Sequence, residues 1–203
     1  MHAKIFFLIC FFSFFSFHAQ ASETDIPKEL QFHLRDAPVK RFELTPFVGD
    51  YLGDKFSHSF HTGAHFDYRI TPAISVGSEF GWSQIQYDAS SKFGSLITND
   101  HLYSFQGNIT FNIPAAFLSK KTVIESEIFT SLGGGILRIN SSNRPSGFLG
   151  GGIKIYFPRC SWLGLRASVR NYFSTVQTTS GTKFSSDLSF SVGPMFLFGS
   201  SLK

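Results

Sequence analysis

The sequence predicts an all-β fold: an eight-stranded antiparallel up-and-down β-barrel that crosses a membrane. Three observations predict it. From residue 42 onward, apolar and polar residues alternate with a period of two, which is typical of strands with one apolar face. Short and long connections follow the strands in turn. The polar face carries Gly and Ser where a surface exposed to water would carry Lys and Glu.

The first 21 residues have the features of a secretory signal peptide. Lys4 supplies the positive charge, residues 5–17 form an apolar run, and residues 19–21 read Ala-Gln-Ala, a small-x-small cleavage site. We expect cleavage near Ala21, with an uncleaved anchor as the alternative. The apolar run is too short to cross a bilayer as a helix.

The rest of the chain divides into three parts. Residues 22–41 are charged and are expected to form a periplasmic lead-in, residues 42–198 the barrel, and residues 199–203 a C-terminal tail. Eight strands are expected, over residues 42–52, 60–70, 74–83, 103–113, 124–136, 150–157, 163–173 and 187–198. The first alternates less cleanly, and Pro46 within it predicts a bulge or a strained pairing.

The connections indicate which ends of the strands face outward. Those after the second and sixth strands are short, at residues 71–72 and 158–161. The longer polar connections follow the odd-numbered strands, at residues 53–59, 88–101, 138–147 and 174–185. Membrane barrels have short periplasmic turns and longer external loops, so these four are expected outside the cell. The link at residues 114–123 is the exception, because it is long and periplasmic.

Alternation alone does not show which face lies inside the barrel, because a soluble lipocalin-like barrel alternates as well. Composition favours a membrane barrel: 42% of the residues are hydrophobic, only 16% are charged, and 26 are Phe. Small residues suit the narrow lumen of eight strands. Aromatic residues near strand ends suit the girdles at the two membrane interfaces. We therefore expect the apolar face to point outward, toward lipid.

The charged residues of the polar face then belong to the lumen. They are mixed in sign, and the set comprises Asp67, Arg69, Glu79, Glu125, Glu127, Lys154, Arg166 and Arg170. Unpaired charges in such a place would cost several kcal/mol each. We hypothesise that these residues pair across the lumen and plug it. A filled lumen disfavours a wide pore, since open channels have about sixteen strands.

Two segments carry a resemblance to a known family. Residues 42–49 read Phe-Glu-Leu-Thr-Pro-Phe-Val-Gly, and residues 76–82 read Val-Gly-Ser-Glu-Phe-Gly-Trp. With the leader and the eight alternating strands, residues 42–198 resemble the small outer-membrane β-barrel domain family, similar to the membrane domain of outer membrane protein A. The resemblance implies the outer membrane of a Gram-negative bacterium, contact with outer-membrane lipids, and insertion by the outer-membrane assembly machinery. That machinery recognises a last strand ending in an aromatic residue; here Phe198 is followed by residues 199–203.

Candidate chemistry is sparse, and no catalytic, cofactor or metal site is expected. His61 and His65 share a strand face but lie about 13 Å apart by strand rise, too far to share a metal. His58-Ser59 resembles part of a hydrolase site, yet no Glu is evidently placed beside it. The Gly-rich segments at residues 133–135 and 150–152 are not phosphate loops, because no Gly-Lys-Ser/Thr follows them. We expect these glycines to permit close strand packing.

The chain is basic, with a net charge of +4, but no basic cluster predicts binding to nucleic acid. The function favoured by the sequence is a non-enzymatic outer-membrane barrel with a structural or surface-interaction role, whose external loops contact an unknown surface ligand. Three alternatives remain: a lipid-modifying enzyme, a narrow channel, and a soluble periplasmic carrier. A His-Ser-acid cluster on the lipid-facing wall, a small discrete conductance, and fractionation without detergent would distinguish them.

Overall fold

The computed structural model describes residues 39–53, 58–91, 94–119, 122–139, 142–157, 159–178 and 181–202. The expected signal peptide and residues 22–38 of the expected lead-in lie outside these ranges. Within the described ranges, no helix is long and apolar enough to cross a membrane.

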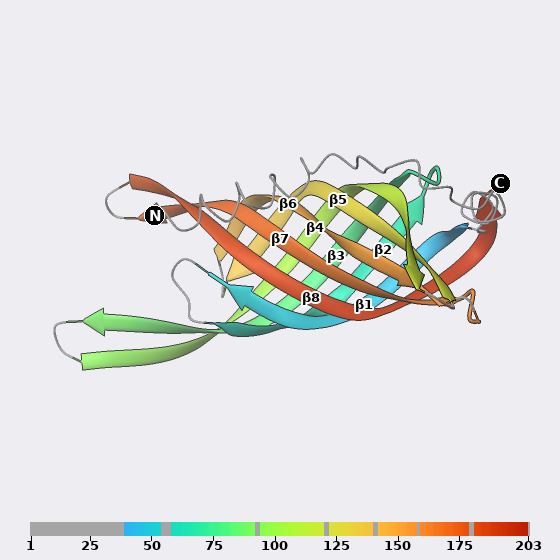
Figure 1. Cartoon of the computed structure of the whole chain (residues 1–203). Helices are drawn as coiled ribbons and strands as arrows, with labels where there is room; N and C mark the ends of the chain where they lie inside the picture. Colours follow the sequence, from blue (N-terminus) through green and yellow to red (C-terminus); the bar gives the residue numbers. More distant parts are fainter. Residues whose placement is uncertain are drawn as a thin grey trace, which may run out of the picture. The chain divides into compact units, whose positions relative to one another are not determined.

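Eight antiparallel strands form the wall of a closed barrel (Figure 1). They are β1 (Val39–Leu52), β2 (Ser59–Arg69), β3 (Ile74–Ser91), β4 (Gly94–Ser119), β5 (Thr122–Ile139), β6 (Ser142–Tyr156), β7 (Leu163–Thr178) and β8 (Gly181–Leu202). Each strand pairs with the next, and β1 pairs with β8. The expected fold class is confirmed. Closure also leaves no open sheet edge along the wall, as a membrane barrel requires.

The period of two in the sequence becomes two faces of the wall. On β4, Phe105, Ile109 and Phe111 are exposed on the outside, whereas Gln106 and Thr110 are buried inside. The same division holds around the ring, and large apolar side chains such as Phe60 (55% exposed) cover the outer surface. An exposed apolar surface of this extent suits lipid and not water, which disfavours the soluble carrier.

Several expected loops are strands in the structure. Hairpin pairing continues to Ser91↔Gly94 between β3 and β4, to Ser119↔Thr122 between β4 and β5, and to Ile139↔Ser142 between β5 and β6. The connections expected at residues 88–101, 114–123, 138–147 and 174–185 are therefore wrong for most of their length. The physical reason is that two antiparallel segments can pair without either face being apolar, so alternation does not reveal them.

The strands of the wall also extend beyond residues 42–198 at both ends. Val39 pairs with Leu202, so three residues before 42 and most of the expected tail belong to strands. The register between β1 and β8 shifts between Lys40 and Phe42. At this shift, residues 199 and 200 of β8 face the single residue Arg41 of β1. Gly199 has a φ of 87°, a conformation that Gly adopts without steric cost.

No bulge forms at Pro46, but the pairing of β1 with β8 is interrupted over residues 45–47, around this proline. Pairing of β1 with β2 runs through Pro46↔Ala64 without a shift, and the register with β8 is the same on both sides of this residue. The bulge lies near Arg41 instead.

Candidate functional site

The lumen holds the densest group of charged side chains in the described structure. Of the residues that the sequence assigns to it, the structure buries Asp67, Arg69, Glu79, Glu127, Lys154, Arg166 and Arg170. Glu125, near the β4–β5 turn, is only half-buried, and the described residues give it no ion pair. Each buried member projects from the face of its strand that alternates with the lipid-facing face.

The first cluster is centred on Arg69 of β2. Its Nε donates to Oε1 of Glu43 at 2.5 Å, and its two terminal nitrogens donate to the carboxylate of Glu127 at 2.9 and 2.6 Å. Lys154 completes the cluster, with Nζ 2.6 Å from Oε2 of Glu43. Two cations thus face two carboxylates, a balanced arrangement in a place where an unpaired charge is costly.

Tyr156 links the members of this first cluster. Its hydroxyl accepts from Arg69 at 2.6 Å and donates to Glu127 at 2.7 Å. Neither Tyr156 nor Glu43 was expected in the lumen from the sequence. Glu43 lies on the strand with the least regular alternation. Tyr156 resembles a lipid-facing aromatic residue in composition, but it lies two positions from Lys154 and therefore shares its lumen-facing side of β6.

A second cluster lies toward the other end of the lumen. Arg166 donates from Nη1 to Oδ2 of Asp67 at 2.5 Å, and Arg170 forms an ion pair with Glu79. The Glu79 carboxylate also accepts from the Tyr172 hydroxyl at 2.6 Å and lies 3.2 Å from Nδ1 of His65.

Four of these ion pairs cross the lumen, whereas Arg69–Glu43 and His65–Glu79 join neighbouring strands. Arg166–Asp67 joins β7 to β2, Arg170–Glu79 joins β7 to β3, Lys154–Glu43 joins β6 to β1, and Arg69–Glu127 joins β2 to β5. None of these strand pairs is hydrogen-bonded side by side. The polar side chains therefore occupy the space between opposite walls.

Two of the lumen cations lie over aromatic rings. The Arg166 guanidinium lies 4.6 Å from the centroid of the Phe129 ring, and that of Arg170 lies 4.7 Å from the Phe148 ring. Such contacts stabilise a cation by about 0.5–2 kcal/mol. Neither ring was assigned a role from the sequence.

Two glycines make room for these rings. A Cβ on Gly152 would come within 2.9 Å of the Phe129 ring, and one on Gly133 would come within 2.6 Å of the Phe148 ring. The Gly-rich segments of β5 and β6 thus allow a close approach between wall and ring.

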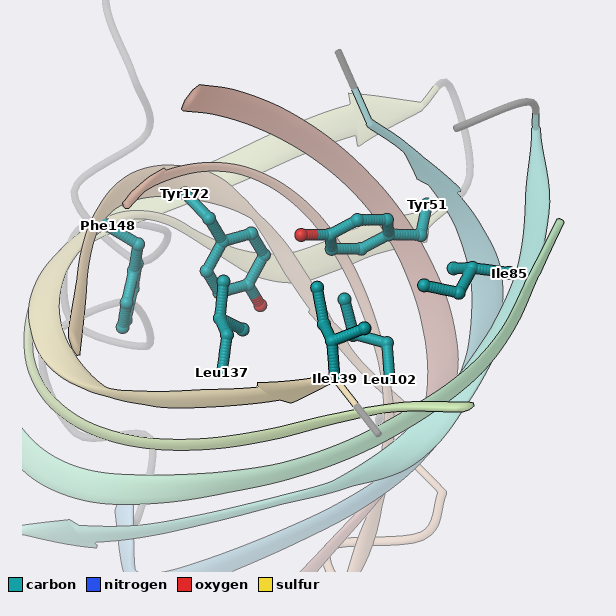
Figure 2. Close-up of a cluster of buried hydrophobic side chains, with 7 residues drawn as sticks. All are labelled: Tyr51, Ile85, Leu102, Leu137, Ile139, Phe148 and Tyr172. Carbon is teal, nitrogen blue, oxygen red and sulfur yellow. The ribbon is translucent and has the colours of Figure 1, made fainter. Parts of the chain in front are cut away.

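An apolar layer lies in the lumen beyond the second cluster. We call it the apolar collar; it consists of Tyr51, Ile85, Leu102, Leu137, Ile139, Phe148 and Tyr172. Figure 2 shows these side chains projecting from the wall into a shared space. At this layer the Tyr51 hydroxyl donates to Asp187 at 2.9 Å. The collar lies at the end where β1, β3, β5 and β7 finish, the same end as the β3–β4 hairpin.

The histidines are arranged for packing. His61 and His65 lie on the two sides of Phe47, with ring centroids 5.1 and 4.5 Å from it, and His61 also lies 2.7 Å from the Ser83 hydroxyl. Among the described residues, no three His, Cys, Asp or Glu side chains are grouped to hold a metal ion.

The candidate hydrolase pair is split between two environments. His58 is exposed and lies 3.0 Å from Oδ1 of Asp50, whereas Ser59 is buried.

Aromatic contacts mark the two ends of the outer surface. At the end with the collar, His101 stacks on Trp82 at 5.8 Å between centroids and lies 6.5 Å from Tyr103. At the opposite end, Phe42 stacks on Phe198 at 5.5 Å and Trp162 on Phe196 at 6.3 Å. Two aromatic groups separated by an apolar zone are the arrangement of interfacial girdles.

Comparison with known proteins places the fold among outer-membrane barrels. No protein-family model matches the sequence, and no curated protein matches it. Among solved structures, the crystal structure of neisserial surface protein A aligns with a TM-score of 0.51 and 12% identity, over 77% of this chain and 97% of that one.

Two further solved structures align over similar lengths. The outer membrane protein AlkL aligns with a TM-score of 0.46 and 10% identity, over 82% of this chain and 95% of that one. The attachment invasion locus protein of Yersinia pestis aligns with a TM-score of 0.38 and 10% identity, over 77% and 97%. The chain has the fold of the small eight-stranded outer-membrane β-barrels.

Proposed function

We propose that this chain is an integral protein of a Gram-negative outer membrane that acts through surface contact and not by transport or catalysis. In this role the barrel is an anchor, its apolar belt contacts outer-membrane lipids, and the outer-membrane assembly machinery inserts it. The hairpins β1–β2, β3–β4, β5–β6 and β7–β8 stand on the external side and make the contacts.

The observation that supports the proposal is a lumen filled with buried side chains. Four ion pairs join strands on opposite sides of the ring, and the apolar collar covers the second cluster. An open channel would need a continuous wet path through these layers. The parts left to meet other molecules are the hairpins.

The position of the strand ends supports the orientation. Val39 and Leu202 pair with each other at the end where the β2–β3 and β6–β7 hairpins turn close to the wall, although β4–β5 extends there. At the opposite end the β3–β4 and β7–β8 hairpins run on past the neighbouring strands before they turn. In membrane barrels, short turns face the periplasm. The opposite end, with the collar and the β3–β4 hairpin, then faces outward.

Two measurements on the full chain test the proposal. In planar lipid bilayers, the purified protein should show no discrete conductance steps, whereas regular steps would support a narrow channel. In intact cells, an epitope inserted after Ser91 should be labelled by an antibody, whereas one inserted after Thr71 should be labelled only after the outer membrane is permeabilised. Labelling in the reverse order would overturn the orientation.

A further inference from the structure

The ring closes where the first and last strands of the barrel, β1 and β8, pair with each other (Figure 1, blue and red). We call this line of contact the closing seam. Among the strand pairs that the structure describes, the other neighbours have registers without a break. The register of the closing seam is broken by the shift between Lys40 and Phe42 and by a gap at residues 45–47. The seam is therefore the least continuous ladder of the wall.

Two prolines face each other in this gap. The register before the gap, Leu44↔Phe196, continues unchanged after it and places Pro46 of β1 opposite Pro194 of β8. Both prolines are exposed on the outer face of the wall. Because proline has no N–H, neither residue can donate a main-chain hydrogen bond to the other strand.

The proline pair occupies a position where two hydrogen bonds normally cross a seam. A Cβ on Gly193 would overlap the carbonyl oxygen of Pro46, so this carbonyl is directed toward β8. Opposite residues whose main-chain groups face each other exchange two N–H···O bonds in an antiparallel pair. Here both donors are absent, and lipid supplies none. The Thr45 hydroxyl does not replace them, because it has no hydrogen-bond partner among the described residues.

The other prolines within described strands, Pro114 and Pro145, stand in a different position. Pairing of β3 with β4 ends at Phe111, and pairing of β6 with β7 ends at Ser146. Each of these prolines therefore has a paired strand on one side only, and the register on that side is unbroken. A missing N–H that faces no strand removes no ladder bond. The prolines of the closing seam, in contrast, lie between two strands.

Side-chain packing holds the seam closed at the gap. On its lumen side, Phe47 lies between the rings of His61 and His65, with centroids 5.1 and 4.5 Å away, and Met195 is fully buried. The two backbones also remain in close contact at Gly193. The gap is thus a loss of hydrogen bonds and not a widening of the wall.

We propose that the closing seam opens locally between Leu44 and Val48 while the other strand pairs stay closed, and that the Pro46–Pro194 pair sets how often it opens. A local opening requires less free energy where fewer hydrogen bonds must break. The opened seam brings Phe47 into contact with lipid, so the wall has a lateral opening point at this position. This inference is independent of the proposed function, because it needs no particular orientation of the barrel in the membrane.

Amide hydrogen exchange of the full chain in lipid nanodiscs, followed by NMR, tests the opening. The amides that cross the seam on either side of the gap belong to Leu44, Val48, Val192 and Phe196. They should exchange at least about tenfold faster than the amides that join β5 and β6 around Thr130↔Gly151, where the ladder is continuous. Low concentrations of urea should not change the rates at the seam, because a local opening exposes little surface. Equal rates in the two ladders, or the same urea dependence in both, would overturn the proposal.

Restoring the two donors should close the seam. In Pro46→Val/Pro194→Val, each strand regains an N–H opposite a carbonyl, and the seam amides should exchange about ten- to a hundredfold more slowly than in the wild type. Pro145→Val is the matched control, because the N–H that it regains faces no paired strand. It should leave the rates at the seam within about twofold of the wild type. Unchanged rates in the double variant, or an equal effect of Pro145→Val, would show that the prolines do not set the opening.

Two further measurements keep the test decisive if the double variant does not fold. The single variants Pro46→Val and Pro194→Val each restore one bond and should slow exchange at the seam about three- to tenfold. No slowing in either variant would contradict the role of the proline pair. The comparison of the two ladders in the wild type needs no variant and decides by itself whether the seam opens first.

Discussion

Arg166 of β7 donates a hydrogen bond of 2.5 Å to Asp67 of β2, across the lumen and between residues 99 positions apart in sequence. Both side chains are almost completely buried. β2 and β7 are not hydrogen-bonded to each other along their backbones, and β8 and β1 lie between them. The Arg166–Asp67 bond therefore links two parts of the ring directly that are otherwise connected only through these intervening strands.

Loss of this pair should destabilise the barrel. Arg166→Met leaves the Asp67 carboxylate buried beside fewer cations, and we expect the free energy of unfolding to fall by about 3–5 kcal/mol. The double variant Asp67→Asn/Arg166→Met should recover part of that loss, because no unpaired charge remains. Urea unfolding in lipid vesicles, followed by Trp fluorescence, measures both. An unchanged midpoint for Arg166→Met, or for Arg166→Ala with Arg170→Ala, would refute the role of the cross-lumen pairs.

Glu43 should matter more than Glu125, although both carboxylates lie on lumen-side positions. Glu43 accepts from Arg69 and Lys154, whereas Glu125 has no ion pair among the described residues. Glu43→Gln removes a charge that two cations share and should lower the free energy of unfolding by several kcal/mol, about 3–5. Glu125→Gln is the matched control and should change it by about 0.5 kcal/mol or less. Equal effects in the same vesicle assay would count against the assignment of the first cluster.

The two faces of β5 should respond differently to the same truncation. Leu137 is buried in the apolar collar at 1% exposure, whereas Leu132 is 49% exposed on the outer face. Leu137→Ala should leave a cavity and cost about 2–5 kcal/mol. Leu132→Ala should cost much less in a bilayer, because lipid fills the space. A larger loss for Leu132→Ala would indicate that the faces are reversed.

Two glycines of the wall make a similar contrast. A Cβ on Gly193 of β8 would overlap the carbonyl oxygen of Pro46 on β1, whereas on Gly107 of β4 the nearest atom would be 3.8 Å away. We expect Gly193→Ala to reduce the yield of heat-modifiable folded barrel on unheated gels, and Gly107→Ala to fold like the wild type. Normal folding of Gly193→Ala would show that β1 and β8 can separate at this point without loss.

The fold was predictable because successive residues of each barrel strand face lipid and lumen in turn, which gives the sequence a period of two. Phe105, Gln106 and Ile109 of β4 show this directly, and the eight strands follow from counting such runs. The ends of the strands were not predictable in the same way. At Ser91↔Gly94 the backbone pairs without needing one apolar face, so the sequence looked like a loop.

The candidate site was predictable only one residue at a time. The alternation along β7 assigns Arg166 to the polar face. Its partner cannot be read from the sequence, because it depends on how far strands on opposite sides of the ring are shifted relative to each other. Glu43 was missed because Phe47 and Tyr51, which occupy lumen-facing positions of β1, obscure its alternation. Phe129 was missed because a lumen aromatic resembles a lipid-facing one in sequence. Parity with Glu127, two positions away, would have placed Phe129 inside.

The most direct test of the account is the accessibility of spin labels along β4. Single Cys residues are introduced in a Cys160→Ser background and labelled in lipid bilayers, at Phe105, Gln106, Asn108, Ile109, Thr110 and Phe111. Collisions with oxygen, which dissolves in lipid, should be frequent at Phe105, Ile109 and Phe111 and rare at the three polar positions, which should also be protected from a water-soluble nickel complex. Frequent oxygen collisions at Asn108 with protection at Ile109, or free access of the nickel complex to Asn108, would contradict a lipid-facing apolar wall around a filled polar lumen.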